Sequence, residues 1–255
     1  MFDTPSEENR RLPKLSRRTA RGAAAAAASG LTALEARRAA GANDRLRLGF
    51  IGVANRGGQL LDAFMQHADC QVVAVCDVSR STLDKARGQV GRQQGGTVDT
   101  CTDFRKLLQR HDLDAVVIAT PDHWHAIQSI DACDAGKDVY VEKPLSITVV
   151  EGRKMVEAAR RNDRVVQVGT HRRSSKLYAR LAELVADDGI GKVTTARSYR
   201  LSNMWPEGIG KAAPSPPPDD LDWNMWLGPR PERPFQATIA PYKFRWCRLY
   251  SSQMA

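Results

Sequence analysis

Cysteine is scarce in this sequence of 255 residues, and its spacing suits neither disulfides nor zinc. The five cysteines are odd in number, and no two of them form a C-x-x-C pair. A disulfide framework or a cysteine-ligated zinc site is therefore not expected. Cys70, Cys76, Cys101 and Cys133 lie in or beside apolar stretches, where cysteine packs as a small hydrophobic residue.

Long apolar runs and basic stripes are also missing. A membrane-spanning helix needs about twenty apolar residues, whereas the run at residues 23–34 is short and mostly alanine. The formal net charge is +9, and residues 1–47 carry more than half of it, with ten Lys or Arg against five Asp or Glu. The remaining charge is spread along the chain without a basic helix face. We therefore expect neither membrane insertion nor a nucleic-acid partner.

The first 44 residues have the composition of an export leader. An arginine pair at 17–18 precedes the alanine-rich run, and residues 40–42 offer small side chains for cleavage. The pair resembles a twin-arginine signal, which would direct the protein to the periplasm. Ala20 stands where such signals usually carry a large apolar residue, so a helical or disordered cytoplasmic tail is the alternative.

Residues 45–168 alternate between apolar strands and helical stretches. The expected strands are continuous apolar runs, typical of a parallel sheet that is buried on both faces. They span residues 46–53, 71–78, 97–101, 113–120, 138–143 and 164–170. The expected helices span residues 57–66, 81–90, 103–110, 122–136 and 146–162, the last with a capping box of Thr148 and Glu151. This order predicts an α/β fold, a doubly wound Rossmann sheet.

The pattern changes after the sheet. Residues 176–187 have helical spacing, and residues 191–203 alternate like a strand with one exposed face. A loop rich in proline and glycine follows. Trp223 and Trp226 come next, and we expect them in a hydrophobic core rather than on a sugar-binding surface. Residues 169–255 are therefore interpreted as an incomplete α+β domain.

A glycine-rich turn follows the first strand and opens a helix. Gly52, Ala54 and Gly57 match the G-x-G-x-x-G pattern with alanine in second place. The first glycine permits the tight turn, the small second residue lets the backbone approach a pyrophosphate, and the third lets helix and strand pack closely. Together with Asn55 and Arg56, these residues predict a dinucleotide site at a helix amino end, with Arg56 as an added phosphate contact.

Asp77, at the end of the second strand, indicates which dinucleotide binds. A carboxylate at this place accepts hydrogen bonds from both ribose hydroxyls and would repel a 2′-phosphate. We therefore expect NAD as the cofactor. Arg80 lies close enough in the sequence to hold a 2′-phosphate, so NADP stays open as the alternative.

Five segments together carry a family resemblance. They are GFIGVANRGG (49–58), CDV (76–78), ATPDHWHA (119–126), DVYVEKPLS (138–146) and VVQVGTHRRSS (165–175). In order and spacing the chain resembles the Gfo/Idh/MocA oxidoreductases, named from glucose–fructose oxidoreductase and inositol dehydrogenase. The resemblance implies a Rossmann domain followed by an α/β domain with an open sheet, which serves substrate binding and oligomerisation. It also implies NAD(P)-dependent hydride transfer on a sugar, polyol or related hydroxy compound, usually by a homo-oligomer.

The resemblance implies roles for individual residues as well. Thr120, Pro121 and His125 match the family's loop that lies along the cofactor. Glu142 is expected near the nicotinamide ribose. Lys143, in the motif EKP, is expected beside the substrate hydroxyl at the catalytic centre.

Elementary chemistry agrees with that role for Lys143. Hydride leaves a carbinol carbon only as the hydroxyl proton is removed, and a lysine at the carboxyl end of a parallel strand faces the crevice where ligands bind. Partial burial would favour the uncharged amine and allow acid–base work. The alternative is a surface lysine that pairs with Glu142.

Other polar residues carry weaker signals. His123 and His125 form an H-x-H pair, but no further ligands accompany them, so a metal is not expected. His171 and Arg172 follow the last strand of the sheet and are candidates for substrate contact. A plain surface position is the alternative for both.

The chain departs from the family in its second domain. Members usually carry an aspartate and a histidine one helical turn apart there, and the histidine commonly works with the EKP lysine. No residue here can be assigned that role, so we interpret the chain as truncated. Three functions follow: an NAD(P)-dependent sugar or polyol dehydrogenase, a nucleotide-binding remnant with little turnover, or an NAD-dependent glycosidase or lyase.

Overall fold

The computed structural model describes residues 45–199 and 208–251. Backbone contacts divide the chain into two units, Met1–Arg45 and Leu46–Ala255. Apart from one residue, the described ranges belong to the second unit. The predicted leader, with its arginine pair and cleavage site, lies outside the described residues. No helix in the described ranges is long and apolar enough to cross a membrane.

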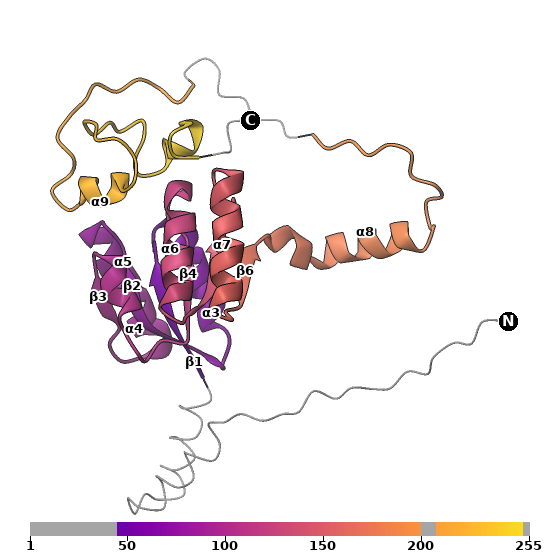
Figure 1. The fold of residues 1–255 in the computed structure, drawn as a ribbon, viewed down its shortest axis with the longest axis horizontal. Helices are drawn as coiled ribbons and strands as arrows, with labels where there is room; N and C mark the ends of the chain where they lie inside the picture. The colour runs from indigo at the N-terminus through magenta and orange to yellow at the C-terminus, as the bar shows by residue number, and fades with distance from the viewer. Residues whose placement is uncertain (1–44, 200–207, 252–255) are drawn as a thin grey trace, which may run out of the picture. The chain divides into compact units, whose positions relative to one another are not determined.

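A six-stranded parallel sheet carries the fold (Figure 1). Its strands are β1 (Leu46–Ile51), β2 (Cys70–Cys76), β3 (Asp99–Cys101), β4 (Ala115–Ile118), β5 (Asp138–Glu142) and β6 (Val166–Gly169). They are ordered β3-β2-β1-β4-β5-β6, so the winding reverses between β1 and β4. All six predicted strands are formed, and their order is that of a Rossmann sheet. The predicted fold class is confirmed.

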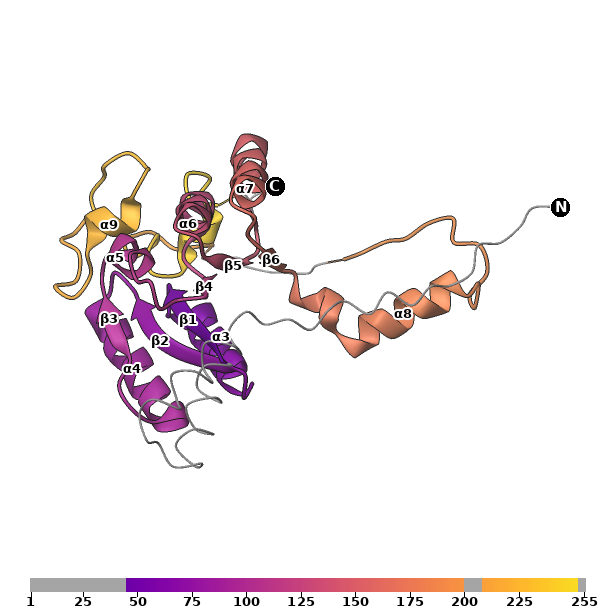
Figure 2. The ribbon, with the colours of Figure 1, turned by 60° about the horizontal axis from the view of Figure 1, so that its bottom comes forward.

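Five helices connect the strands and cover both faces of the sheet (Figure 2). They are α3 (Asn55–Met65), α4 (Arg80–Gln94), α5 (Phe104–Leu108), α6 (Asp122–Asp134) and α7 (Val149–Arg161). Along β4, Val117 packs in the cluster with α3 and α4, whereas Val116 and Ile118 pack in the cluster with α5, α6 and α7. Both faces of the central strands are buried, which explains why their sequences are apolar throughout.

The predicted capping box starts α7. The Thr148 hydroxyl accepts a hydrogen bond from Glu151 N at 3.2 Å, and Glu151 Oε2 accepts one from Thr148 N at 3.0 Å. These bonds satisfy backbone amides that have no partner within the helix. The capping box is therefore confirmed, and it fixes where the chain leaves the turn after β5.

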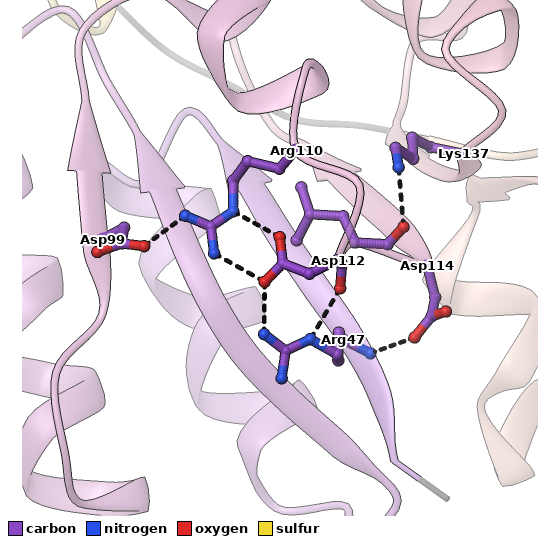
Figure 3. A network of polar contacts seen from close by, with 7 residues as sticks. Arg47, Asp99, Arg110, Asp112, Asp114 and Lys137 are labelled. Carbon is purple, nitrogen blue, oxygen red and sulfur yellow. Dashed lines mark hydrogen bonds and ion pairs between the residues drawn. The ribbon is translucent and has the colours of Figure 1, made fainter. Parts of the chain in front are cut away.

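A network of charged side chains ties together the amino ends of the strands, away from the glycine-rich turn (Figure 3). Arg47 of β1 donates to the Asp112 carboxylate at 2.5 Å and to the Asp112 carbonyl oxygen at 2.8 Å. Arg110 pairs with the same carboxylate at 2.8 Å and also with Asp99 of β3. The Arg110 hydrogen bond is the largest cause that lowers the pKa of Asp112 to about 2. Because these groups are partly exposed, the network positions the strands more than it stabilises them.

Residues 170–199 contain no packed core. A 3-10 helix at His171–Ser174 leads into α8 (Lys176–Ala186), and neither buries a side chain. The strand predicted at 191–203 is wrong for its described part, because residues 191–199 are exposed and form no strand. A strand is held by hydrogen bonds to a neighbour, and none of the described strands lies beside this segment. Positions 200–203 lie outside the described residues, and the predicted domain boundary stays a prediction.

Residues 208–251 form a small core of their own around α9 (Trp223–Leu227). Trp223 and Trp226 are buried, and their stacked rings lie 4.8 Å apart between centroids. Phe235 packs edge-on against Trp223 at 5.2 Å. The prediction that these tryptophans belong to a core is confirmed.

This second core is joined to α6 of the sheet. His123 Nε2 and Trp124 Nε1 both lie within hydrogen-bond distance of the Trp226 carbonyl oxygen, at 2.9 and 3.1 Å. Gly228 ends α9 with φ at +54°, and a Cβ there would lie 2.0 Å from Trp124 Cζ2. The junction therefore depends on a glycine at the place where α9 meets α6.

Replacing Gly228 by alanine is expected to disrupt this junction. The Cβ would clash with the Trp124 ring at a positive φ, and the free energy of unfolding should fall by about 3 kcal/mol. Urea unfolding followed by tryptophan fluorescence measures the change. Gly210→Ala is the matched control, because its φ is +79° but its Cβ would meet only Lys243 Nζ at 3.8 Å. Its expected loss is about 1 kcal/mol, and equal losses would show that Trp124 does not confine Gly228.

Candidate functional site

The turn between β1 and α3 brings backbone atoms into close contact. Gly52 has φ at +80°, a conformation that favours glycine. A Cβ on Gly57 would lie 1.9 Å from the Gly52 carbonyl oxygen, so only glycine fits there. Among the described residues, no side chain caps α3 at its N-cap, Ala54. The amino end of α3, with its partial positive charge, therefore suits a phosphate.

Asp77 holds this turn from the end of β2. Its Oδ2 accepts a hydrogen bond from Val53 N at 2.9 Å, and its Oδ1 accepts one from Ser79 N at 3.0 Å. Burial raises the pKa of Asp77, and the hydrogen bonds from these backbone amides oppose the rise. Each carboxylate oxygen has a further lone pair, which a ribose hydroxyl could use.

A cavity of about 660 Å³ joins these groups. It lies at the carboxyl ends of the strands, where the winding reverses between β1 and β4, the usual ligand site of open α/β sheets. The predicted site residues that line it are Gly52, Ala54, Asn55, Arg56, Asp77, Thr120, Pro121, His125, Glu142, Lys143 and His171. Two predicted residues do not line it: Gly57 packs against the Gly52 backbone, and exposed Arg172 donates to the Tyr178 hydroxyl at 3.0 Å.

Arg56 and Glu142 form an ion pair in the cavity wall. Arg56 Nε lies 2.8 Å from Glu142 Oε1, and Glu142 is only 4% exposed. The guanidinium thereby neutralises a buried carboxylate and links α3 to the end of β5. Glu142 Oε2 also accepts a hydrogen bond from Lys143 N at 3.2 Å. The phosphate contact predicted for Arg56 stays a prediction.

Lys143 lines the cavity with an exposed side chain. The partial burial expected from the sequence is therefore wrong for the described residues. Lys143 lies one residue beyond β5, past the packed interior of the sheet, so no hydrophobic layer covers it there. The ion pair with Glu142 that the surface interpretation required is not formed either, because Glu142 pairs with Arg56.

His125 connects the turn after β4 to the turn that carries Lys143. It is 1% exposed, its Nε2 lies 2.9 Å from the Thr120 carbonyl oxygen, and its Nδ1 lies 2.7 Å from the Pro144 carbonyl oxygen. The Thr120 hydroxyl in turn hydrogen-bonds to Gln128 Oε1 at 2.7 Å. The structure thus gives His125 a positioning role, and its predicted contact with the cofactor stays a prediction.

His123, the other member of the H-x-H pair, serves the junction with α9. Its ring lies 5.3 Å from the Trp226 ring and 5.2 Å from the Tyr250 ring. Burial lowers the pKa of His123 to about 4, so the ring is neutral at pH 7. In the part of the chain that the structure describes, no group of three or more His, Cys, Asp or Glu side chains could hold a metal ion.

Residues 208–251 supply a part of the cavity wall that the sequence did not predict. Asp220, Leu221, Trp226 and Phe244 line the cavity beside the Rossmann residues. The apolar spacing around the two tryptophans indicates a core, but it carries no information on which surface that core covers. The positions of these residues follow from contacts between segments that lie far apart in the sequence.

These observations define a class of protein: a Rossmann domain whose cavity suits a dinucleotide. Residues 46–170 match the family described as "Oxidoreductase family, NAD-binding Rossmann fold", GFO_IDH_MocA. The domain at residues 46–170 thus matches the Gfo/Idh/MocA family, and the resemblance seen in the sequence is confirmed. NAD is the cofactor of the family, in agreement with the prediction from Asp77.

Curated relatives share the same domain. A "Glycosyl hydrolase family 109 protein" of Shewanella sp. strain W3-18-1 is 37% identical over 125 residues, which is 48% of this chain and 27% of the relative. The "Alpha-N-acetylgalactosaminidase" of Shewanella oneidensis is 36% identical over 123 residues, 47% of this chain and 27% of the relative. The chain thus spans about a quarter of the length of these relatives.

Solved structures agree on the fold. The myo-inositol 2-dehydrogenase of Lactobacillus plantarum is 25% identical with a TM-score of 0.54, over 58% of this chain and 43% of that one. The scyllo-inositol dehydrogenase of Lactobacillus casei, solved with bound NAD(H) and scyllo-inositol, is 25% identical with a TM-score of 0.55. That match covers 59% of this chain and 43% of the other.

A methyl group at Gly57 is expected to weaken dinucleotide binding strongly. Gly57→Ala would drive a Cβ into the Gly52 carbonyl oxygen and displace the turn that approaches the pyrophosphate. NADH titration followed by nicotinamide fluorescence should show affinity weakened by about a hundredfold or more. Gly58→Ala is the control on the same helix, since its Cβ would meet Val53 O only at 3.6 Å. Equal affinities for the two variants would contradict the turn geometry as the basis of binding.

Acidification is expected to destabilise the chain through His123. Its pKa is lowered from 6.5 to about 4, so the unfolded chain takes up a proton before the folded chain does. Neutral His123 contributes fully to the free energy of unfolding above about pH 6.5. As the pH falls toward 4 this contribution is lost, and the free energy of unfolding falls by up to about 3 kcal/mol. Urea unfolding across this range should show a steeper loss for the wild type than for His123→Phe. Parallel pH profiles would contradict a buried neutral His123.

Proposed function

We propose that this chain acts as an NAD-dependent oxidoreductase on the hydroxyl group of a sugar, polyol or related compound. The observation that carries the proposal is the position of Lys143. It lines the same cavity as the turn at Gly52 and Asp77, so an amine and a dinucleotide site share one space. The Lactobacillus casei enzyme, whose structure holds NAD(H) and scyllo-inositol, supports a carbohydrate-like substrate.

The residues present fit NAD. The glycine pair leaves room for a pyrophosphate at the amino end of α3, and Asp77 offers acceptor lone pairs at the end of β2. Thr120 and Pro121 line the cavity beside the start of α6. When bound, NAD would supply the acceptor for a hydride from the substrate carbon.

The chain's own contribution is proton transfer and positioning. Oxidation of a carbinol removes a hydride from carbon and a proton from oxygen, and Lys143 Nζ in its uncharged form would accept that proton. His125 holds the turn of Lys143 through the Pro144 carbonyl oxygen, and the Arg56–Glu142 pair holds the end of β5. Both contacts fix the backbone around Lys143 relative to the cofactor-binding turn.

An NAD-dependent glycosidase is the second candidate. It is favoured by the curated relatives, which are named as a glycosyl hydrolase family 109 protein and an alpha-N-acetylgalactosaminidase. They are more similar in sequence to this chain than the inositol dehydrogenases are. Such a reaction would use NAD to oxidise the sugar, break the glycosidic bond with the addition of one water, and reduce the sugar again, so no net NADH forms. A nucleotide-binding remnant with little turnover is the remaining alternative. Export by the leader stays part of the proposal, supported by its arginine pair.

Turnover assays on the whole chain should separate these functions. We expect NADH formation, followed by its absorbance, with an inositol or sugar and NAD. Lys143→Met should lower kcat by about a hundredfold or more while the Kd for NADH changes less than about twofold, because the amine handles a proton and does not bind the cofactor. Lys154→Met, which removes an exposed lysine of α7, is the control.

Each other outcome points to a different function. Cleavage of a nitrophenyl α-N-acetylgalactosaminide that requires NAD and forms no net NADH would establish the glycosidase. Saturable NADH binding without turnover of any compound would identify a nucleotide-binding remnant. Full activity in Lys143→Met would remove Lys143 from the chemistry.

A further inference from the structure

Asp220 sits at the amino end of α4, although it comes from the distant segment 208–251. Its Oδ2 accepts hydrogen bonds from Ser81 Oγ at 2.5 Å, Ser79 Oγ at 3.0 Å and Ser81 N at 3.3 Å. Ser79 is also the N-cap of α4, because its hydroxyl accepts a bond from Thr82 N at 3.3 Å. The carboxylate therefore occupies the anion position that the end of this fifteen-residue helix provides.

The same loop lies beside Asp77, the carboxylate that is predicted to bind the ribose. Ser79 N donates to Asp77 Oδ1 at 3.0 Å, while the Ser79 hydroxyl donates to Asp220 Oδ2. A single residue thus bridges the two acids. Asp77, Ser79, Ser81 and Asp220 all line the cavity that contains the glycine-rich turn. Asp220 is consequently part of the dinucleotide cavity at its ribose end.

The loop itself carries the groups that would bind a 2′-phosphate. Ser79 and Ser81 offer hydroxyl donors, Ser81 offers a backbone amide, and the Arg80 side chain is exposed nearby. In this fold a phosphate on the ribose would need those same donors. In the structure, the two serine hydroxyls and the Ser81 amide all donate to the Asp220 carboxylate instead.

We propose that Asp220 is a specificity-determining residue that holds the place of a 2′-phosphate and, together with Asp77, makes the cavity select NAD over NADP. A 2′-phosphate would meet a carboxylate where it needs donors, and like charges repel at close range. The hydrogen bond from Ser81, followed by that from Ser79, lowers the pKa of Asp220, so the group is anionic at neutral pH. The inference rests on the dinucleotide site of the proposed function.

The docking of the segment does not depend on the Asp220 carboxylate alone. Arg80 N donates to the Asp220 carbonyl oxygen, and Asp222 N donates to the Val78 carbonyl oxygen, both at 2.9 Å. Leu221 and Ser79 form a β-bridge in the same place. These backbone contacts persist when the side chain is changed, so substitutions of Asp220 can test selectivity in a folded chain.

The test compares NADH and NADPH binding by nicotinamide fluorescence in the full chain. The wild type should bind NADH more tightly. Asp220→Ser and Asp220→Asn should each tighten NADPH binding about tenfold or more and change NADH binding less than about twofold. The double variant Arg80→Ser with Asp220→Ser should lose most of the gain in NADPH affinity, because it lacks the guanidinium that would bind the 2′-phosphate.

Asp219→Asn is the matched control, because it removes the same charge from the neighbouring exposed position. It should leave the ratio of the two Kd values unchanged. An unchanged ratio in both Asp220 variants, with NADH binding and circular dichroism retained, would overturn the inference while leaving the proposed function intact. An equal gain in Asp219→Asn would overturn it too, by showing a general charge effect. A wild type that binds neither nucleotide would overturn both the inference and the proposed function.

Discussion

The contact between Gly57 and the Gly52 carbonyl oxygen is the constraint on which the cavity depends. It lets α3 start directly behind the end of β1, with no room for a Cβ between them. The amino end of the helix therefore faces the carboxyl edge of the sheet, and Val53 N reaches Asp77. Arg56, in the first turn of α3, is brought within 2.8 Å of Glu142 at the end of β5. One backbone approach thus aligns groups from β1, β2 and β5.

The polar groups of the cavity divide into two ends. Asp77 and Asp220 lie around Ser79 at the end of β2, where donors from the backbone and the serine hydroxyls stabilise both carboxylates. Lys143 lies beyond β5, where Glu142 is neutralised by Arg56. This polarity agrees with the proposed function, in which a neutral ribose would bind at the acidic end and a hydroxyl substrate beside the amine.

The Rossmann domain alone does not distinguish the two proposed enzyme activities. Proteins named as glycosyl hydrolases and proteins named as inositol dehydrogenases share the domain at residues 46–170 with this chain. The domain carries the dinucleotide turn and Lys143, which we propose for proton transfer in either reaction. The proposals on turnover and on cofactor selection are therefore separate, since they concern opposite ends of the cavity.

The Rossmann sheet, the glycine-rich turn, the capping box of α7 and the place of Asp77 could all be predicted from the amino-acid sequence. These features follow from local rules: strands buried on both faces are apolar throughout, and the spacing of the glycines reflects sterics within a few residues. The pairing of distant polar groups could be seen only in the folded chain, as for Arg56 with Glu142 over 86 residues and Asp220 with Ser81 over 139. Residues 191–199 form no strand, although their polar and apolar residues alternate. Alternation distinguishes the two faces of a strand, but a strand also needs a neighbouring strand to accept and donate its hydrogen bonds.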